Sequence, residues 1–489
     1  MADVSAEIPL RPAGPSADDA SSSTGSDLLD RAQDDDSLLG HGGAPRVRGH
    51  VGVAGRPSSI ANLSNTILGA GILAMPHALR SDGILLGLVV IVWSGLTSGT
   101  GLYLQYRCAR YVERGGASFF NLSLMTYPSL SVVFDAAIAI KCFGVGVSYL
   151  IIIGDLMPQV VLDVLPDLAG TGAAVLDRRL WVSFFMVVLV PLCFLRRMDS
   201  LKYTSVVALV AIGYLVLLVL GHFFVGDLAE LRGPISLLPQ STSAVLTSFP
   251  VVVFGFTCHQ NMFSIVNELR DNSASSVVSV ITSSIGSAIV LYTAVGMAGY
   301  LSFGDAVSGN IISMYPRSLT SAIGRVAIVV LVLFSYPLQC HPCRNSLASI
   351  LHLRPMQRIE RALAARAAGV PVAVSAMSQT RFVTITTLIM VLSYIVAMTV
   401  TSLETVLSFV GATGSTSISF ILPGVFAYKL LGSPYHVPVL DDTPDPADQT
   451  EPAPARDGQT IRTVSLALAC WGGFVMVVCL SANIWHVLQ

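Results

Sequence analysis

The residue types best suited to binding a small polar solute lie in the stretch 59–76, Ser-Ile-Ala-Asn-Leu-Ser-Asn-Thr-Ile-Leu-Gly-Ala-Gly-Ile-Leu-Ala-Met-Pro. This stretch has the apolar content of a membrane-spanning helix, yet Gly69, Gly71 and Pro76 interrupt it. Glycine adds backbone freedom, whereas proline removes an N–H donor and clashes with the preceding turn. In hydrocarbon, an opened turn is tolerated only where it faces protein or a polar cavity. We therefore expect a broken helix whose freed N–H and C=O groups face a small polar ligand.

A second interruption is predicted at 254–260, Phe-Gly-Phe-Thr-Cys-His-Gln. Paired interrupted helices at matching places in two halves of a chain point to the binding site of a secondary transporter. The two stretches together predict a transport site built largely from main-chain groups.

The surrounding chain has the composition of an integral membrane protein. Of its 489 residues, 53% are hydrophobic and only 12% are charged, and the mean hydropathy is +0.69. No soluble domain of this length needs so much apolar content, and a net charge of -2 gives no reason to invoke nucleic acid. We expect an all-α fold whose eleven runs can each cross a bilayer of about 30 Å. These runs are 58–80, 83–106, 130–165, 179–195, 201–225, 242–267, 275–302, 319–347, 380–401, 403–430 and 461–484.

The composition also divides the chain into segments. Residues 1–57 lack periodic apolar residues and are expected to be a disordered cytosolic tail. The transporter core is predicted at 58–430, a flexible cytosolic linker at 431–460, and the eleventh helix in 461–489. Most of the 28 lysines and arginines fall in loops on the same side as the N-terminus. This asymmetry predicts a cytosolic N-terminus and a luminal C-terminus.

The core is expected to contain two halves, 58–225 and 242–430, each of which opens with its broken helix. Because each half has five spans, the second half enters the membrane from the opposite side. This arrangement predicts two inverted repeats with the binding site at their interface near the midplane. The eleventh helix lies outside the repeat and is expected at the periphery.

No motif supports an enzyme, a metal site or ATP-driven pumping. The phosphate-binding pattern Gly-x-x-x-x-Gly-Lys-Ser/Thr is absent, and no catalytic arrangement of side chains is recognisable. The pair Cys340 and Cys343 lacks the second ligand pair that a zinc site needs, so packing within a helix is the expected role. No structural disulfide and no cofactor are expected.

Three motifs resemble the amino acid/auxin permease family, most closely its fungal vacuolar amino acid transporters and sodium-coupled neutral amino acid transporters. They are Asn65-Thr-Ile-Leu-Gly-Ala-Gly-Ile-Leu-Ala-Met-Pro76, Phe254-Gly-Phe-Thr-Cys-His259 with Val266-Asn-Glu-Leu-Arg270, and Tyr336-Pro-Leu-Gln-Cys-His-Pro-Cys-Arg344. The resemblance covers roughly 58–485. It implies a LeuT-type fold, alternating access, and transport of amino acids coupled to protons or sodium.

An amino acid substrate carries a carboxylate and an ammonium, and both need partners once out of water. The first break lies at a half-helix N-terminus, whose dipole favours the carboxylate. We expect the N–H groups of Leu68, Gly69, Ala70 and Gly71 to bind it. The ammonium is expected near carbonyls of Thr66 and Phe254, assisted by Thr257. Close helix packing is the alternative role of the two glycines.

Ion coupling is predicted at three residues. In the sodium-coupled relatives an asparagine that matches Asn65 contributes to coupling, and a hydroxyl is placed where Ser335 lies. His259 is a proton-coupling candidate because imidazole titrates between pH 5 and 8. For each, a structural role in helix packing or hydrogen bonding is the alternative. Glu268 and Arg270 are predicted to form a cytosolic gate, or else to be a solvated helix end.

These observations predict a secondary active, proton-coupled amino acid transporter of a vacuolar or lysosomal membrane. The stretch 34–39, Asp-Asp-Asp-Ser-Leu-Leu, matches the acidic dileucine pattern of sorting adaptors, and chance leucines in an acidic tail are as good an explanation. An amino acid sensor and a plasma-membrane sodium symporter are the alternative functions. The sequence does not identify the amino acid.

Overall fold

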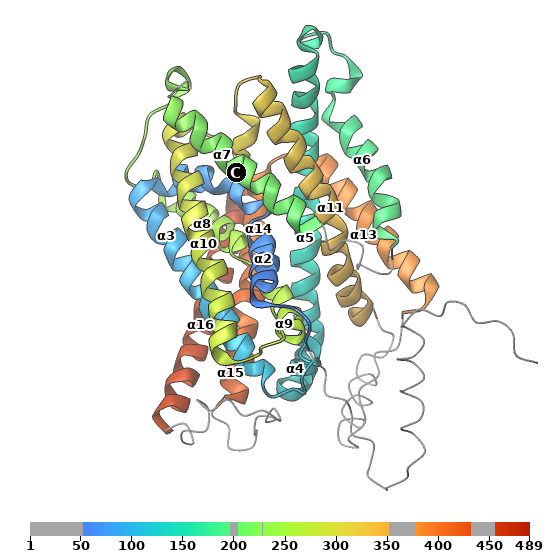
Figure 1. Cartoon of the computed structure of the whole chain (residues 1–489), viewed down its shortest axis with the longest axis vertical. Helices are drawn as coiled ribbons and strands as arrows, with labels where there is room; N and C mark the ends of the chain where they lie inside the picture. Colours follow the sequence, from blue (N-terminus) through green and yellow to red (C-terminus); the bar gives the residue numbers. More distant parts are fainter. Residues whose placement is uncertain (1–51, 196–203, 227, 352–376, 432–454) are drawn as a thin grey trace, which may run out of the picture. The chain divides into compact units, whose positions relative to one another are not determined.

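A computed structural model describes residues 52–195, 204–226, 228–351, 377–431 and 455–489. Within these residues the protein is all-helical, and a single isolated β-bridge joins Ala54 to Leu269. Most of the predicted tail at 1–57, the stretch 34–39 and most of the linker at 431–460 lie outside the described residues. Figure 1 shows the helices standing side by side.

The first predicted break is present. Helix α2 (Arg56–Ile67) ends before the first of the two glycines, and helix α3 (Gly71–Ala109) begins at the second. Helix α3 contains a second departure from helical geometry at Gly83, where φ is 70°. This positive φ is accessible to glycine at little steric cost, so the chain turns there between the first and second predicted spans.

The second predicted break is present as well. Helix α8 (Thr242–Gly255) and helix α9 (His259–Glu268) are separated by three residues. The tenth predicted span is also irregular. Between α14 (Leu403–Val410) and α15 (Leu422–Leu430) the chain is π-helical over η9 (Gly411–Ser415) and η10 (Ser417–Ile421). Single π-helical turns inside α-helices are frequent at functional sites.

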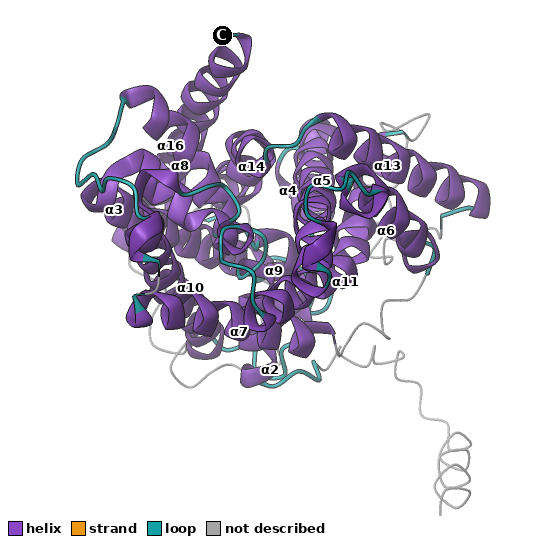
Figure 2. Cartoon of the chain, turned by 90° about the horizontal axis from the view of Figure 1, so that it is seen from above, coloured by secondary structure: helices purple, strands orange, loops and turns teal. Residues whose placement is uncertain are grey.

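The remaining helices are regular. They are α4 (Phe119–Thr126), α5 (Ser131–Val164), α6 (Arg178–Cys193), α7 (Thr204–Val225), α10 (Ala274–Phe303), α11 (Leu319–Ile350), α13 (Gln379–Thr399) and α16 (Ala455–Leu488). Helix α5 packs along α11, and α3 packs along α10 and α8. Helix α16 stands at the edge of the bundle against α15, η10 and α8, as expected for an element outside the repeats (Figure 2).

Nine segments of the described chain are long and apolar enough to cross a membrane. Two of the eleven predicted spans are not among them. The run 58–80 is divided by the break between α2 and α3, and α6 has only 16 residues. The count of eleven therefore remains a prediction.

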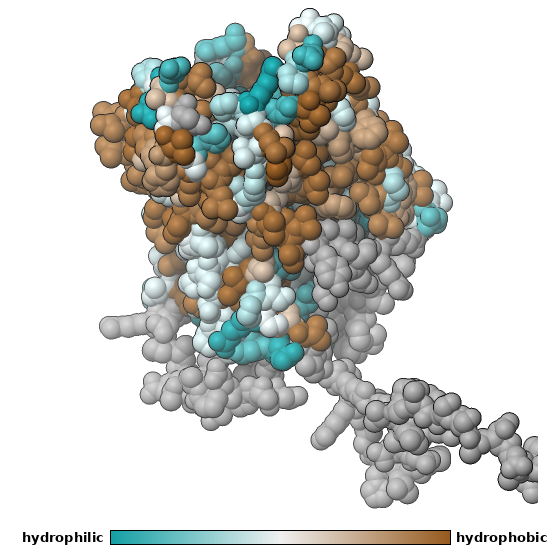
Figure 3. All heavy atoms as spheres, turned by 45° about the horizontal axis from the view of Figure 1, so that its top comes forward, coloured by the Kyte–Doolittle hydropathy of each residue, from teal (hydrophilic) through white to brown (hydrophobic). Residues whose placement is uncertain are grey.

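The outer surface of the bundle fits a lipid environment. Val187, Leu217 and Phe224 are 71%, 72% and 79% exposed, respectively. On the face shown in Figure 3, hydrophobic residues cover the middle of the molecule and hydrophilic residues gather toward its ends. An exposed apolar surface of this extent is unfavourable in water and favourable in a bilayer. The chain is an integral membrane protein.

Candidate functional site

The two helix breaks lie against each other. A Cβ atom added to Gly71 would lie 2.7 Å from the Cα of Gly255. Tyr292 of α10 joins the breaks, because its hydroxyl oxygen lies 2.6 Å from the carbonyl oxygen of Ile67 and 2.8 Å from that of Gly255. The last carbonyls of α2 and α8 therefore both face one buried hydroxyl group, whose single hydrogen they share, and the Ile67 carbonyl also accepts from the N–H of Gly69.

Main-chain groups of the first break are partly used within the break itself. The N–H groups of Leu68 and Gly69 donate to the carbonyls of Ser64 and Ile67, both at 2.8 Å. Of the four N–H groups predicted to bind a carboxylate, those of Ala70 and Gly71, the latter at the start of α3, have no main-chain partner in the described structure.

Side chains link the first break to neighbouring helices. Thr66 donates to the carbonyl of Asn62 at 3.0 Å and accepts from the Asn261 amide at 2.8 Å, so it connects α2 to α9. Predicted residue Asn65 lies next to it on α2. Thr66 thus connects α2 to α9, the second part of the second broken helix.

Ser335 also lies near the first break. It stands on α11 beside the hydroxyl of Tyr149, which α5 contributes. A Cβ atom on Gly69 would lie 3.9 Å from that same hydroxyl, at ordinary contact distance. Tyr149, which sequence reasoning did not select, therefore brings α5 and α11 to the first break.

The second break is held by α3 and η10. The carbonyl of Phe254 accepts from the N–H of Thr257 at 3.0 Å, and that of Phe256 accepts from the Ser98 hydroxyl at 2.8 Å. Thr257 in turn accepts from Ser419 at 3.3 Å. His259 begins α9, is fully buried, and places Nε2 3.1 Å from the carbonyl oxygen of Ser98.

Several of the sequence-predicted positions are therefore engaged in the protein. Thr66, Phe254, Thr257 and His259 all have hydrogen-bond partners, which are consistent with the structural alternatives stated above. The Nδ1 atom of His259 has no partner in the described structure.

At the end of α9 the backbone closes the bundle. The N–H of Ala54 donates to the carbonyl of Glu268 at 2.8 Å, and the N–H of Arg270 donates to the carbonyl of Ala54 at 2.9 Å. Arg114 donates to the carbonyl of Arg270 at 2.7 Å. Both predicted gate residues thus lie at a closure, and the contacts described here use their main-chain atoms.

An ion pair that sequence reasoning missed completes this closure. Arg56 at the start of α2 pairs with Asp271, and the Arg56 hydrogen bond lowers the pKa of that carboxyl to about 2. We call the set of residues 54–56 and 268–271 the latch. The signal for it was present in the sequence as a basic and an acidic residue flanking the two broken helices.

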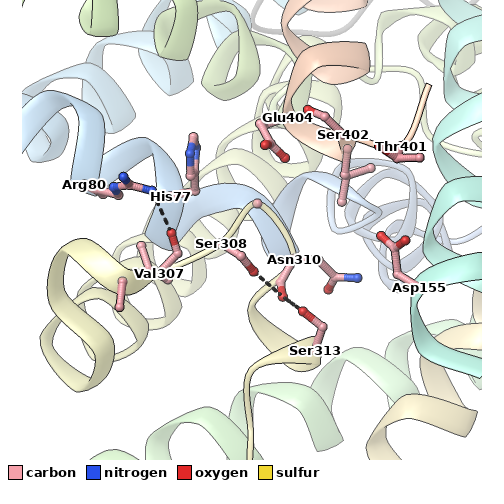
Figure 4. A pocket seen from close by; sticks show the side chains of 13 residues that line it. His77, Arg80, Asp155, Val307, Ser308, Asn310, Ser313, Thr401, Ser402 and Glu404 are labelled. Atoms are coloured by element: carbon pink, nitrogen blue, oxygen red, sulfur yellow. Dashed lines mark hydrogen bonds between the residues drawn. The ribbon is translucent and has the colours of Figure 1, made fainter. Parts of the chain in front are cut away.

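At the opposite end of the bundle lies a polar cavity of about 420 Å³. Its walls come from α3, α5, the segment 306–313 that follows α10, and the start of α14. They include His77 and Arg80 on α3, Asp155 on α5, and Glu404 on α14 (Figure 4). Asp155 pairs with Arg178 at 3.3 Å. The Asn310 side chain also lines the cavity, is 5% exposed, and has no partner for its amide in the described structure.

A smaller cavity of about 160 Å³ adjoins the first and shares His77 and Glu404 with it. Its lining includes Ser248 of α8 and Asn483 of α16. Ser248 hydrogen-bonds Asp82, which is fully buried at the turn of α3. Sequence reasoning missed Asp82 because it drew a loop between runs ending at 80 and beginning at 83.

Comparison with known families gives a single consistent picture. A family described as "Transmembrane amino acid transporter protein" matches residues 53–437. The chain is 46% identical over 441 residues to "Vacuolar amino acid transporter 5" of Schizosaccharomyces pombe, covering 89% of this chain and 96% of that protein. It is 40% identical to "Vacuolar amino acid transporter 6" of Saccharomyces cerevisiae, covering 88% and 99%.

More distant relatives agree in class. "Sodium-coupled neutral amino acid transporter 7" of Mus musculus is 29% identical over 59% of this chain and 63% of its own. Among solved structures, Mhp1, a nucleobase-cation-symport-1 family transporter in a closed conformation with bromovinylhydantoin bound, matches with a TM-score of 0.51 at 14% identity. That match covers 92% of this chain and 96% of Mhp1, and it shows that the fold is LeuT-like.

Proposed function

The chain belongs to the transmembrane amino acid transporter family, which confirms the resemblance seen in its motifs, and we propose that it is a proton-coupled secondary transporter of a vacuolar or lysosomal membrane. It is an amino acid transporter and not an enzyme. The proposal concerns the driving ion, the membrane and the mechanism.

The observation that carries the proposal is the meeting of two broken helices between a closed end and an open one. The breaks touch at Gly71 and Gly255, the latch closes one end, and the cavity with Asn310 and Glu404 lies toward the other. A transporter that alternates between two sides needs such an asymmetry in any one state. Eleven spans arranged as inverted repeats 58–225 and 242–430 account for this geometry.

In the proposed site the amino acid binds at the first break. Its carboxylate accepts from the free N–H of Ala70 at the start of α3, where the helix dipole adds to the attraction. The Tyr149 hydroxyl beside Gly69 is a further donor in reach of a small ligand there. Opening of the Gly71–Gly255 contact makes room for the ammonium near Thr66 and Thr257. Main-chain polar groups recognise what all amino acids share, so specificity rests on other side chains.

Ion coupling is proposed at Asn65, His259 and Ser335, next to the two breaks. The latch, which includes Glu268 and Arg270, acts as the gate on its side. With the N-terminus cytosolic, the latch faces the cytosol and the polar cavities face the lumen. The vacuolar names of the relatives that share 46% and 40% of their residues with this chain support an internal membrane, and the stretch 34–39 offers a sorting signal for it.

The test is uptake by the purified full-length protein in liposomes, using an equimolar mixture of radiolabelled amino acids. Accumulation driven by a pH difference, and unchanged when choline replaces sodium, is the expected result. Loss of uptake on removing sodium would favour a sodium symporter. Saturable binding without any flux would favour a sensor.

A further inference from the structure

Asp82 is a buried carboxyl group that the transport site described above does not use. It lies in α3 immediately before the turn at Gly83, and none of its surface is exposed. One carboxyl oxygen, Oδ1, hydrogen-bonds Ser248 of α8. This contact therefore joins the outer parts of the two broken helices, since Asp82 lies eleven residues beyond Gly71 and Ser248 lies seven before Gly255.

The number of hydrogen atoms at this contact indicates the state of the carboxyl group. The Ser248 oxygen also lies 3.2 Å from the carbonyl oxygen of Val245, so it faces two acceptors if Asp82 is ionised. A serine hydroxyl has one hydrogen to donate, and an ionised carboxylate has none. A proton on Oδ1 of Asp82 supplies the missing hydrogen. Asp82 then donates to Ser248, and Ser248 donates to Val245.

The surroundings offer an ionised Asp82 no compensation. Within the described residues it forms no ion pair, and its second oxygen, Oδ2, has no hydrogen-bond partner. Helix α8 carries no titratable side chain at all. Other titratable groups do lie around this part of α3. They are His77 and Arg80 on α3 itself, Glu404 on α14, His486 on α16, Tyr300 on α10, and its partner Asp305 just after α10.

A route for a proton leads to Asp82 through Ser248, its side-chain partner among the described residues. Ser248 lines the smaller cavity, whose wall includes His77, Glu404 and the Asn483 side chain. Asn483 is 4% exposed and leaves its amide nitrogen unpaired in the described structure, so the cavity holds a donor aimed at water or another polar group. This cavity adjoins the larger one at the same end of the bundle.

We propose that protonation of Asp82, in addition to the coupling proposed at the two breaks, is required to couple proton movement to amino acid transport. The inference rests on the proposed proton-driven function and adds to it a proton-binding group at the outer end of the broken helices. With the proton bound, the chain from Asp82 through Ser248 holds α3 against α8. When the proton passes to water in the cavity, the carboxylate needs hydration, since a bare charge in the membrane costs several kcal/mol. The two helices then separate, and this movement reaches the breaks through the contact of Gly71 with Gly255.

The test compares wild type and Asp82→Asn, both full length in liposomes, with the same radiolabelled amino acid mixture. The asparagine amide can still donate to Ser248, but it cannot bind or release a proton. A pH difference of one unit supports at most about tenfold accumulation for each proton carried. We expect Asp82→Asn to lose this accumulation, falling to about onefold, while exchange of internal for external amino acid at equal pH stays within about twofold of wild type.

Asp177→Asn is the control, because Asp177 is an exposed carboxylate that lines neither cavity and accepts from the N–H of Arg179 at the start of α6, a role that asparagine can also fill. It is expected to keep proton-driven accumulation. If Asp82→Asn impairs exchange through misfolding, Ser248→Ala replaces it, with slower proton-driven uptake and intact exchange expected. Proton-driven accumulation by Asp82→Asn at the wild-type level would overturn the inference and leave the proposed function standing. Absence of proton-driven accumulation in wild type would instead overturn the proposed function.

Discussion

Gly69 and Gly71 stand two residues apart in the first break, yet a side chain added to each would meet different surroundings. At Gly71 a Cβ atom would press on the Cα of Gly255, whereas at Gly69 it would reach only the Tyr149 hydroxyl at 3.9 Å. Packing therefore excludes a side chain at Gly71, and only a ligand would exclude one at Gly69. The structure therefore assigns close helix packing to Gly71 and leaves substrate binding as the proposed role of Gly69.

Gly69→Ala is expected to fold normally and to raise the KM for transport, because its methyl group occupies space proposed for the substrate carboxylate. Gly71→Ala is expected to lose about 1–3 kcal/mol of stability through overpacking. Thermal unfolding in detergent and concentration-dependent uptake measure the two effects. A normal KM in folded Gly69→Ala would place the substrate elsewhere.

Tyr292→Phe removes a hydroxyl that contacts both breaks; the Ile67 carbonyl keeps the Gly69 N–H as a partner, whereas the Gly255 carbonyl loses its bond to the Tyr292 hydroxyl. A buried polar group left unpaired costs about 1–3 kcal/mol, so we expect a lower unfolding temperature together with reduced uptake. Tyr214→Phe is the control, since its hydroxyl donates to the Thr320 carbonyl at an exposed site. Equal losses in both variants would show that the bridge between the breaks has no special role.

Sequence reasoning found both breaks because the glycines and Pro76 interrupt apolar runs locally. It did not find Tyr292, whose partner Ile67 lies 225 positions away, because nothing in the residues of α10 indicates which helix they face. Asp82 was missed for a different reason. A carboxyl in a buried turn looks the same in sequence as one in a solvated loop, until the neighbouring segments are placed.

Among the helices, the latch is the element whose strength can be changed without touching the breaks. Arg56 and Asp271 are half-exposed, so their ion pair contributes only about 0.2–1 kcal/mol. The β-bridge between Ala54 and Leu269 adds main-chain hydrogen bonds to it. The ion pair and the main-chain hydrogen bonds together hold the latch closed in this structure, and their small free energy is compatible with opening of the latch during transport.

The ion pair lowers the pKa of Asp271 to about 2, below the value of about 3.9 for a free aspartate. The stability that the ion pair adds to the latch is therefore present above pH 4 and is lost as the pH falls toward 2. The latch should therefore be equally closed at pH 5 and pH 8. Asp271→Asn should open it at both, seen as faster hydrogen exchange at 52–56 and 268–271. A latch that loosens between pH 8 and pH 5 in wild type would mean that another group controls it.

The tenth span shows what periodicity cannot reveal about an element. A single apolar run at 403–430 predicted one helix, and the structure has α14, two π-helical segments and α15 in its place. The reason lies in other helices, since Gly411 packs on the carbonyl of Pro250 and Gly414 on Lys141. These close approaches reshape the backbone where α5 and α8 meet it.

At the scale of the whole molecule, the described structure is asymmetric between its ends. Hydropathy predicted an all-helical membrane protein, and the resemblance to the permease family implied a LeuT-type fold, which the structural match bears out. The sequence could not predict which end would be open, because that depends on the relative energies of whole conformations. It also could not locate the cavities. The walls of the larger one come from α3, α5, the segment 306–313 and the start of α14, and those of the smaller one from α3, α8, α14 and α16.

The asymmetry predicts one-sided access to the larger cavity. Ser308 lines that cavity and is half-buried, so a cysteine placed there in a variant without other reactive thiols should react with a membrane-impermeant maleimide from the luminal side. Thr66→Cys, between the breaks and the latch, should stay unreactive from the cytosolic side until the latch opens. In an alternating transporter, opening one end requires closing the other. Adding Asp271→Asn to Ser308→Cys should therefore slow the labelling of the cysteine at 308. Adding Asp271→Asn to Thr66→Cys should make the labelling of the cysteine at 66 faster. Both sites becoming faster together would show a channel-like opening and contradict alternating access.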